Sequence, residues 1–387
     1  MRAHGVRQPH HFHIGLFLHG HVLPFVKKNA VLLIALCAAA ITACIIPPSK
    51  AYLGYFDWKT LTCLFCVLAV VCALKNIRFF FFLAQKIVRT FKNARACVLA
   101  LAYVTFIGSM LIANDMALLT FLPLGYFVLS STGKRKYIAF TFIMQNIAAN
   151  LGGMLTPFGN PQNLYLYTKY LIPTGEFMLI MLVPFLISVA LITLCCIIFV
   201  KKEDMTIEET KITLPLWRTI AYGVLFALSI VIVFRVIPFW IGLIVIPIAL
   251  LFLDRKALGK VDYGLLLTFM AFFIFSGNMA QIPAIQRIFG SLLSKNPLLV
   301  STLSCQVISN VPSAILLSQF TSNYEALLLG VNIGGCGTLI SSLASLITFR
   351  EYTSHNPGGG KKYILLFSAF NFAFLGILFG ACFLLTM

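Results

Sequence analysis

The feature that most constrains this chain is a polar, glycine-rich motif that occurs twice inside long apolar segments. The first copy reads Asn-Leu-Gly-Gly-Met-Leu-Thr over residues 150–156, and the second reads Asn-Ile-Gly-Gly-Cys-Gly-Thr over residues 332–338. A polar break within a membrane-length apolar run is costly unless it lines a cavity. Two such breaks in matching places of two halves indicate a site at a repeat interface, which is typical of secondary transporters.

The composition predicts a membrane protein. Of the 387 residues, 60% are hydrophobic and only 10% are charged, whereas a soluble domain has about 25% charged residues. Because a chain that spans the hydrocarbon must satisfy its backbone internally, we expect an all-α polytopic membrane protein.

The net charge of +18 follows from a one-sided distribution of positive charges. With the N-terminus in the cytoplasm, 23 of the 29 lysines and arginines fall on the inner side. The six on the outer side are Lys50, Lys59, Lys169, Arg235, Arg287 and Lys295. This distribution obeys the positive-inside rule and requires no nucleic acid as a partner. We therefore expect a multi-pass protein of the cell (inner or plasma) membrane, surrounded by the lipid bilayer, with a cytoplasmic N-terminus.

Two apolar segments contain a turn. Segment 297–320 turns at residues 309–310, and each arm is too short to cross about 30 Å of hydrocarbon, so we expect a re-entrant hairpin. Segment 96–131 turns at residues 114–115 and has longer arms. It therefore fits either a second hairpin or two full spans.

The remaining segments divide into two halves. We expect a cytoplasmic, His-rich basic arm at 1–28, a first membrane repeat at 29–200 and a cytoplasmic linker at 201–217. Residues 218–387 then supply a connecting span and a second repeat, whose topology that extra span inverts. Segment 137–173 is too long for one straight helix and is broken after its motif. The total is about nine transmembrane helices plus two re-entrant hairpins.

Asp115, at the first turn, is the acidic residue that the sequence places deep in the membrane. Such a carboxyl group costs several kcal/mol unless it is neutralised, paired or bound to an ion. It is therefore a candidate coupling site. The alternative is a turn at the far membrane surface, where Asp115 would be a solvated helix cap.

The turns and breaks offer polar ligands but no permanent positive charge. Helical arms begin at Asp115 and Val311, and their free N–H groups favour an anion. Because no lysine or arginine falls in the predicted site, we expect a substrate of low charge or co-binding of H⁺ or Na⁺. The candidate ligands are the amides of Asn114, Asn150, Asn163, Asn310 and Asn332 and the hydroxyls of Thr156, Ser309, Thr338, Ser341 and Ser342. The candidate Na⁺ ligands are Asn114, Asp115, Gly153, Asn310 and Gly335. No other metal and no cofactor is expected.

An alternative for each Asn-x-Gly-Gly copy is a tight helix–helix crossing with buried amide hydrogen bonds. Enzyme activity is not expected, because no histidine falls in a predicted span and a His-Glu-x-x-His motif is absent.

At these residues the chain resembles the ion transporter superfamily, which includes arsenite permeases, Na⁺/H⁺ antiporters, citrate transporters and divalent anion:sodium symporters. The resemblance rests on residues 113–123, 150–163, 309–312 and 332–339. It implies a scaffold domain and a moving transport domain, often in a homodimer, with elevator-like alternating access. By position, it implies a first clamp formed by Asn114, Asp115, Gly159, Asn160, Pro161 and Asn163 and a second formed by Ser309, Asn310, Gly337 and Thr338.

These observations predict a secondary active transporter of a small anion or oxyanion, coupled to H⁺ or Na⁺. The first turn reads Asn-Asp-Met, whereas the sodium–dicarboxylate members have Ser-Asn-Thr, so it is closer to the arsenite-permease and antiporter branches. The alternatives are a Na⁺/H⁺ antiporter and an uncoupled anion channel or uniporter.

Overall fold

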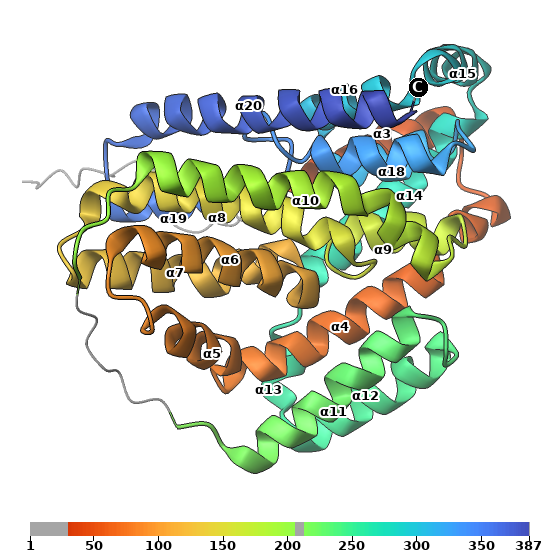
Figure 1. Cartoon of the computed structure of the whole chain (residues 1–387). Coiled ribbons are helices and arrows are strands. Elements are labelled where there is room, and N and C mark those ends of the chain that lie inside the picture. Colours follow the sequence, from red (N-terminus) through yellow and green to blue (C-terminus); the bar gives the residue numbers. More distant parts are fainter. Residues whose placement is uncertain (1–29, 206–212, 387) are drawn as a thin grey trace, which may run out of the picture.

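The protein is described by a computed structural model that covers residues 30–205 and 213–386. Within these ranges every regular element is a helix (Figure 1). By length and composition, seven of the helices described could cross a membrane. The expectation of an all-α polytopic membrane protein is therefore confirmed. The predicted arm at 1–28 lies outside the described residues.

The chain forms two successive sets of helices, joined by α11 (Leu216–Val233). The first set is α3 (Ala30–Ile45), α4 (Trp58–Asn76), α5 (Phe79–Val88), α6 (Ala94–Ile112), α7 (Asn114–Ser131), α8 (Ile138–Gly152), α9 (Pro161–Lys169) and α10 (Thr174–Phe199). The second set is α12 (Phe239–Leu253), α13 (Arg255–Gly259), α14 (Tyr263–Gln281), α15 (Pro283–Lys295), α16 (Pro297–Ile308), α17 (Asn310–Leu317), α18 (Tyr324–Ile333), α19 (Leu343–His355) and α20 (Gly360–Thr386).

The two sets correspond element by element, except that α13 has no counterpart. The first helix of each set packs on the second long helix of the other, α3 on α14 and α12 on α4. The helices α4 and α14 also begin in the same way. The carboxylates of Asp57 and Asp262 accept a hydrogen bond from the backbone N–H three residues later, at 3.0 and 2.9 Å. This N-cap satisfies one of the free donors of each helix.

The long helices gather in two bundles. The scaffold bundle comprises α3, α4, α11, α12 and α14, and the hairpin bundle comprises α6–α10 and α16–α20. The short helices α5 and α15 connect them, and Figure 1 shows α11 and α12 on the edge opposite α20. Across the seam between the bundles, α17 packs on α14 and α9 packs on α4.

The hairpin arms differ in length between the halves. The arms α16 and α17 have 12 and 8 residues, which is too short for a crossing. The arms α6 and α7 have 19 and 18 residues, but their tip stops at the break between α8 and α9. There the backbone N–H of Asn114 donates to the carbonyl of Gly159 at 3.1 Å, and α9 continues beyond. The tip of the first hairpin therefore stops at the break of a broken helix, although its first arm, α6, is long and apolar enough to cross a membrane.

The helix that carries the first motif is enclosed by protein. In an 18-residue apolar window of the span Arg135–Leu155, which includes α8, 89% of the residues are buried, compared with 22% in the corresponding window of α10. The outer helix α10 is apolar all round and has few buried residues, as expected for a helix in lipid. The enclosed α8 can therefore carry polar groups that lipid would not tolerate.

Candidate substrate and ion site

The two hairpin tips share an unusual backbone conformation. Ala113 has φ 67° and ψ 151°, and Ser309 has φ 73° and ψ 160°. Residues other than glycine rarely adopt these values, which cost on the order of 1–3 kcal/mol. At each tip the following asparagine, Asn114 or Asn310, accepts a 2.9 Å hydrogen bond at its Oδ1 from the next backbone N–H. Both arms thus begin one residue earlier than predicted, at these asparagines.

Each tip is bonded to the break of the neighbouring broken helix. The N–H of Asn114 bonds to the carbonyl of Gly159, and the N–H of Asn310 bonds to the carbonyl of Ser341 at 2.9 Å. Gly159 and Ser341 occupy the same position, nine residues after the asparagine that opens each motif. The two halves therefore build the same junction from different residues.

The threonine that closes each motif secures the same junction from the side. The hydroxyl of Thr156 donates to the carbonyl of Met110 at 2.7 Å, and that of Thr338 donates to the carbonyl of Gln306 at 3.1 Å. Both carbonyls lie in the last turn before a tip. The threonines therefore bond the first arm of each hairpin, α6 or α16, to the neighbouring broken helix.

Buried asparagines connect the two broken helices. The Nδ2 of Asn332 donates to the Oδ1 of Asn163 at 2.7 Å. The Nδ2 of Asn160 donates to the Oδ1 of Asn332 at 3.3 Å and to the carbonyl of Asn150 at 3.2 Å. Asn150 in turn accepts from the Nδ2 of Asn114 at 3.2 Å. For each motif, the sequence offered buried amide hydrogen bonds at a helix crossing as an alternative. In the structure such bonds link the two motifs to each other and to the first tip.

A cavity of about 580 Å³ lies between the bundles where the tips and breaks meet. Its apolar wall includes Phe272 and Phe275 of α14, and its polar lining consists of Asn114, Asp115, Gln162, Thr268, Ser304, Ser309, Asn310 and Ser342. Among the residues described, no lysine or arginine lines this central cavity, and Asp115 is its one charged residue.

Two oxygen atoms at the central cavity have no partner. The Oδ1 of Asp115 and the Oε1 of Gln162 are buried, and neither accepts a hydrogen bond from the described residues. A buried carboxylate oxygen without a donor is costly, so it favours a proton or a bound cation. These two oxygen atoms are therefore the candidate acceptors for a proton, a cation or a donor group of the substrate.

The predicted site residues fall into two groups. Those that line the central cavity are Asn114, Asp115, Pro161, Ser309, Asn310 and Ser342. Those outside its lining are Asn150, Thr156, Gly159, Asn160, Asn163, Asn332, Gly337 and Thr338. Most of the second group hold the tips and breaks in place through the hydrogen bonds described above.

The carbonyls suggested as Na⁺ ligands already accept hydrogen bonds. The Gly153 carbonyl accepts from the Nδ2 of Asn163 at 3.3 Å. The Gly335 carbonyl accepts from the hydroxyl of Ser341 at 2.8 Å. The Gly335 carbonyl also accepts from the Nδ2 of Asn150 at 3.4 Å, so a cation at this oxygen would have to displace one of its two donors. Among the described residues, no group of three or more His, Cys, Asp or Glu side chains is placed to hold a metal ion.

Three polar residues of the central cavity, Gln162, Thr268 and Ser304, were not predicted from the sequence. Gln162 lies within the stretch 150–163, between the predicted site residues Pro161 and Asn163, so its position in the sequence indicates the site. Thr268 lies inside α14 and Ser304 inside α16, where a single hydroxyl has no distinguishing pattern. Only the packing of these helices against the tips brings them to the cavity.

The two corresponding helix sets, the paired tips and the cavity between the bundles are those of a multi-pass membrane transporter. The chain belongs to the citrate transporter family, which it matches over residues 22–325. It is 36% identical over 301 residues to the uncharacterized transporter MJ0456 of Methanocaldococcus jannaschii, covering 76% of this chain and 81% of that protein. It is 31% identical over 313 residues to the inner membrane protein YbiR of Escherichia coli, covering 78% and 82%.

Proposed function

We propose that this transporter is a secondary active permease for a small anion or oxyanion, coupled to H⁺ or Na⁺. The observation that carries the proposal is the unpartnered, buried Oδ1 of Asp115 at the edge of the central cavity. A proton or Na⁺ on this carboxylate would remove the cost of burying it and would allow an anion to bind nearby.

The hairpin tips supply the attraction for the anion. Helices α7 and α17 both begin at the cavity, at Asn114 and Asn310. The positive ends of their dipoles favour negative charge. The first two N–H groups of each helix already donate hydrogen bonds within the tips, so the dipoles carry this attraction. Without a lysine or arginine among the described lining residues, this attraction is weak unless the Asp115 charge is neutralised. Anion and cation binding would therefore be coupled.

We also propose the orientation and surroundings of the transporter. The positive-inside rule places the N-terminus in the cytoplasm, and the bacterial relative is called an inner membrane protein. A homodimer remains an expectation that rests on the resemblance to the superfamily.

The proposal is tested by reconstitution into liposomes. Uptake of a panel of anions, with citrate included because of the family, would be measured under an imposed pH gradient or Na⁺ gradient. We expect uptake that depends on one gradient and is lost in Asp115→Asn. The matched control is Glu325→Gln, which removes an exposed carboxylate in the first turn of α18 and should leave uptake unchanged.

Two outcomes would replace the proposal by its alternatives. Exchange of Na⁺ for H⁺ without uptake of any anion would identify a Na⁺/H⁺ antiporter. Anion flux that ignores both gradients and persists in Asp115→Asn would identify an uncoupled channel or uniporter.

A further inference from the structure

A second pocket, of about 450 Å³, lies on the seam between the bundles and carries two lysines. Lys59 comes from the first turn of α4 in the scaffold bundle, and Lys169 comes from the end of α9 in the hairpin bundle. The polar side chains around them include Asp57, Tyr165, Thr168 and Gln319. Both lysines belong to the six cations on the side predicted to face outward.

The carboxylate in this pocket is already engaged. The Oδ1 of Asp57 accepts from the N–H of Thr60 at 3.0 Å, and its Oδ2 accepts from the hydroxyl of Thr60 at 2.7 Å. Among the described residues, neither Lys59 nor Lys169 forms an ion pair with a carboxylate. Lys169 instead lies 5.7 Å from the ring centroid of Tyr165. The Asp57 carboxylate keeps its charge and offsets one of the two ammonium groups, so the pocket retains a net positive charge. Its low-dielectric walls focus this field on an anion.

This second pocket, which we call the lysine pocket, lies beside the central cavity along the same seam between the bundles. Along α9, Gln162 lines the central cavity, whereas Tyr165 and Lys169 line the lysine pocket. Residues spaced by three and four positions lie on one face of a helix. The seven residues from 162 to 169 correspond to about 10 Å of helix. Likewise, Leu316 of α17 lines the central cavity, and Gln319, just beyond that helix, lines the lysine pocket.

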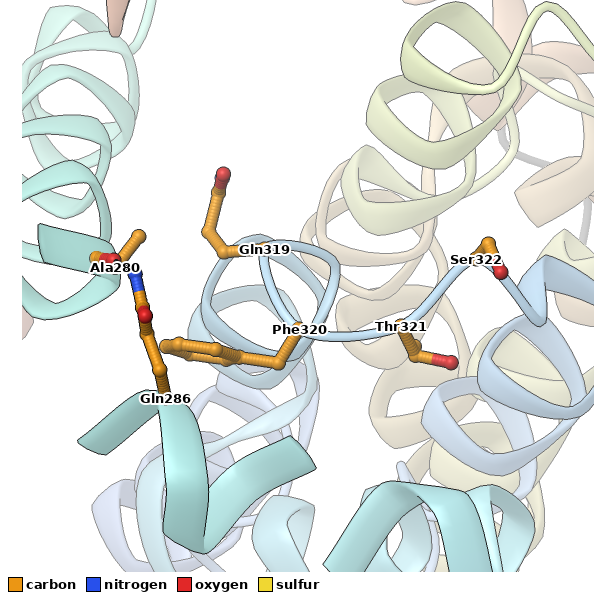
Figure 2. Close-up of a pocket in the computed structure, with 6 residues that line it drawn as sticks. All are labelled: Ala280, Gln286, Gln319, Phe320, Thr321 and Ser322. Carbon is orange, nitrogen blue, oxygen red and sulfur yellow. Dashed lines mark hydrogen bonds between the residues drawn. The ribbon is translucent and has the colours of Figure 1, made fainter. Parts of the chain in front are cut away.

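A neighbouring pocket lacks the positive charge of the lysine pocket. This pocket of about 470 Å³ lies between the end of α14, helix α15 and the residues after α17, and it shares Gln319 with the lysine pocket. Figure 2 shows the Gln319 side chain pointing away from Gln286 and Phe320. Its six described lining residues include no charged side chain. It therefore offers no comparable attraction for an anion.

From this arrangement we propose that Lys59 and Lys169 form a second anion-binding site, a vestibule one to two helical turns outside the central cavity. Its ligand is a carboxylate or oxyanion, held by two ammonium groups from opposite sides of the seam. The role as a vestibule rests on the proposed function, since none of the described residues that line the central cavity is a lysine or arginine that could concentrate an anion. The binding site itself does not depend on transport.

The site is tested first by protection of the lysines. The purified protein would be treated with an amine-reactive reagent with and without citrate, and the labelling rate of each lysine measured by mass spectrometry. Citrate should slow labelling of Lys59 and Lys169 about threefold or more at low ionic strength, and added salt should weaken this protection. Lys295, exposed at the end of α15 and predicted to lie on the same side of the membrane, should be labelled at the same rate in both samples. Equal protection of all three lysines, or of none, would overturn the site.

The vestibule role is tested by transport kinetics. Lys59→Gln and Lys169→Gln should each raise the KM for the transported anion about threefold at low salt with little change in kcat, because a surface charge acts mainly on the encounter rate. The control Lys295→Gln should keep the wild-type KM. Unchanged KM values in both vestibule variants would overturn the role. Failure of the wild-type protein to transport any anion would instead contradict the proposed function, and the labelling result would still decide whether the site exists.

Discussion

The Nδ2 of Asn332 donates a 2.7 Å hydrogen bond to the Oδ1 of Asn163, so one amide pair joins α18 of the second half to α9 of the first. Both side chains are buried, and Asn332 also accepts from the Nδ2 of Asn160 at 3.3 Å. The bond therefore couples the two broken helices behind the central cavity.

Loss of this bond should destabilise the protein. Asn332→Ala would leave the Oδ1 of Asn163 without its Asn332 donor, at a cost of about 1–3 kcal/mol in the free energy of unfolding. Unfolding in detergent would be measured for Asn332→Ala, Asn163→Ala and the double variant. We expect a coupling energy of about 0.5–3 kcal/mol, since the two residues share one interaction. Strictly additive effects would contradict the direct link.

Gly337 should not tolerate a side chain. Its φ is +119°, and a Cβ atom there would lie 2.1 Å from the Oε1 of Gln306. Gln306 cannot easily withdraw, because its Nε2 donates to the carbonyls of Gly334 and Cys336 at 2.9 and 3.1 Å. Gly337→Ala should therefore lower the free energy of unfolding by about 2 kcal/mol or more.

A second glycine provides the control for this prediction. Gly290 lies inside α15, and a Cβ atom there would meet nothing within 4 Å. Gly290→Ala should stabilise the protein by about 0.5–1 kcal/mol, since alanine restricts the unfolded chain. Thermal unfolding of both variants should thus show shifts of opposite sign; a shared direction would contradict the assignment.

Glu203 should make stability depend on pH in the acid range. Hydrogen bonds from Lys136 at 2.6 Å, Lys134 at 3.0 Å and Tyr137 at 2.9 Å lower the pKa of Glu203 to about 2 from its ordinary value of 4.5. A lowered pKa in the folded state means that the contribution is complete above pH 4.5. It is lost as the pH falls toward 2.

The measurement is the difference in unfolding temperature between the wild type and Glu203→Gln. This difference should be largest at neutral pH and should shrink below pH 4.5, where the wild-type carboxylate becomes protonated in the unfolded state. The exposed Glu325→Gln variant should show no such trend. A difference that stays constant from neutral pH to pH 3 would rule out the Glu203 cluster as its source.

Arg235 should hold the end of α9 against the scaffold bundle. It lies between α11 and α12, and its guanidinium donates to the carbonyls of Tyr167 and Ile172, the latter at 3.1 Å. It also stacks on the Tyr167 ring, with its Cζ 3.7 Å from the ring centroid. An elevator-like movement of the hairpin bundle would have to break these contacts.

Hydrogen exchange tests this contact. Arg235→Gln should speed amide exchange in residues 167–172 about tenfold, since hydrogen bonds to a charged group contribute about 1.5–3 kcal/mol each. The control Arg287→Gln removes an exposed arginine whose one described hydrogen bond is to its own helix. Equal exchange in the two variants would show that Arg235 does not hold the segment.

Much of the candidate site could be predicted from the sequence because its signals are local. A polar residue in an apolar run is visible without any structure, which is how Asp115, Asn114 and Asn310 were found. Predicted site residues outside the cavity lining, such as Asn163 and Asn332, also follow from the sequence. Only the packing of the helices shows that these two side chains bond to each other. Thr268 could not be predicted as a cavity residue, because the sequence of its helix does not indicate which helices pack against it.

The sequence by itself determined the membrane class, the two halves, the paired breaks and the charge asymmetry. These properties follow from solvation and from the spacing of residues along one chain, and they do not require knowledge of contacts. Only the tertiary structure decided that both tips meet at one cavity, that the first hairpin stops at the α8–α9 break, and that Lys59 and Lys169 line one pocket on the seam. These relationships join residues far apart in the chain, and their geometry depends on how whole helices pack, which local periodicity does not encode.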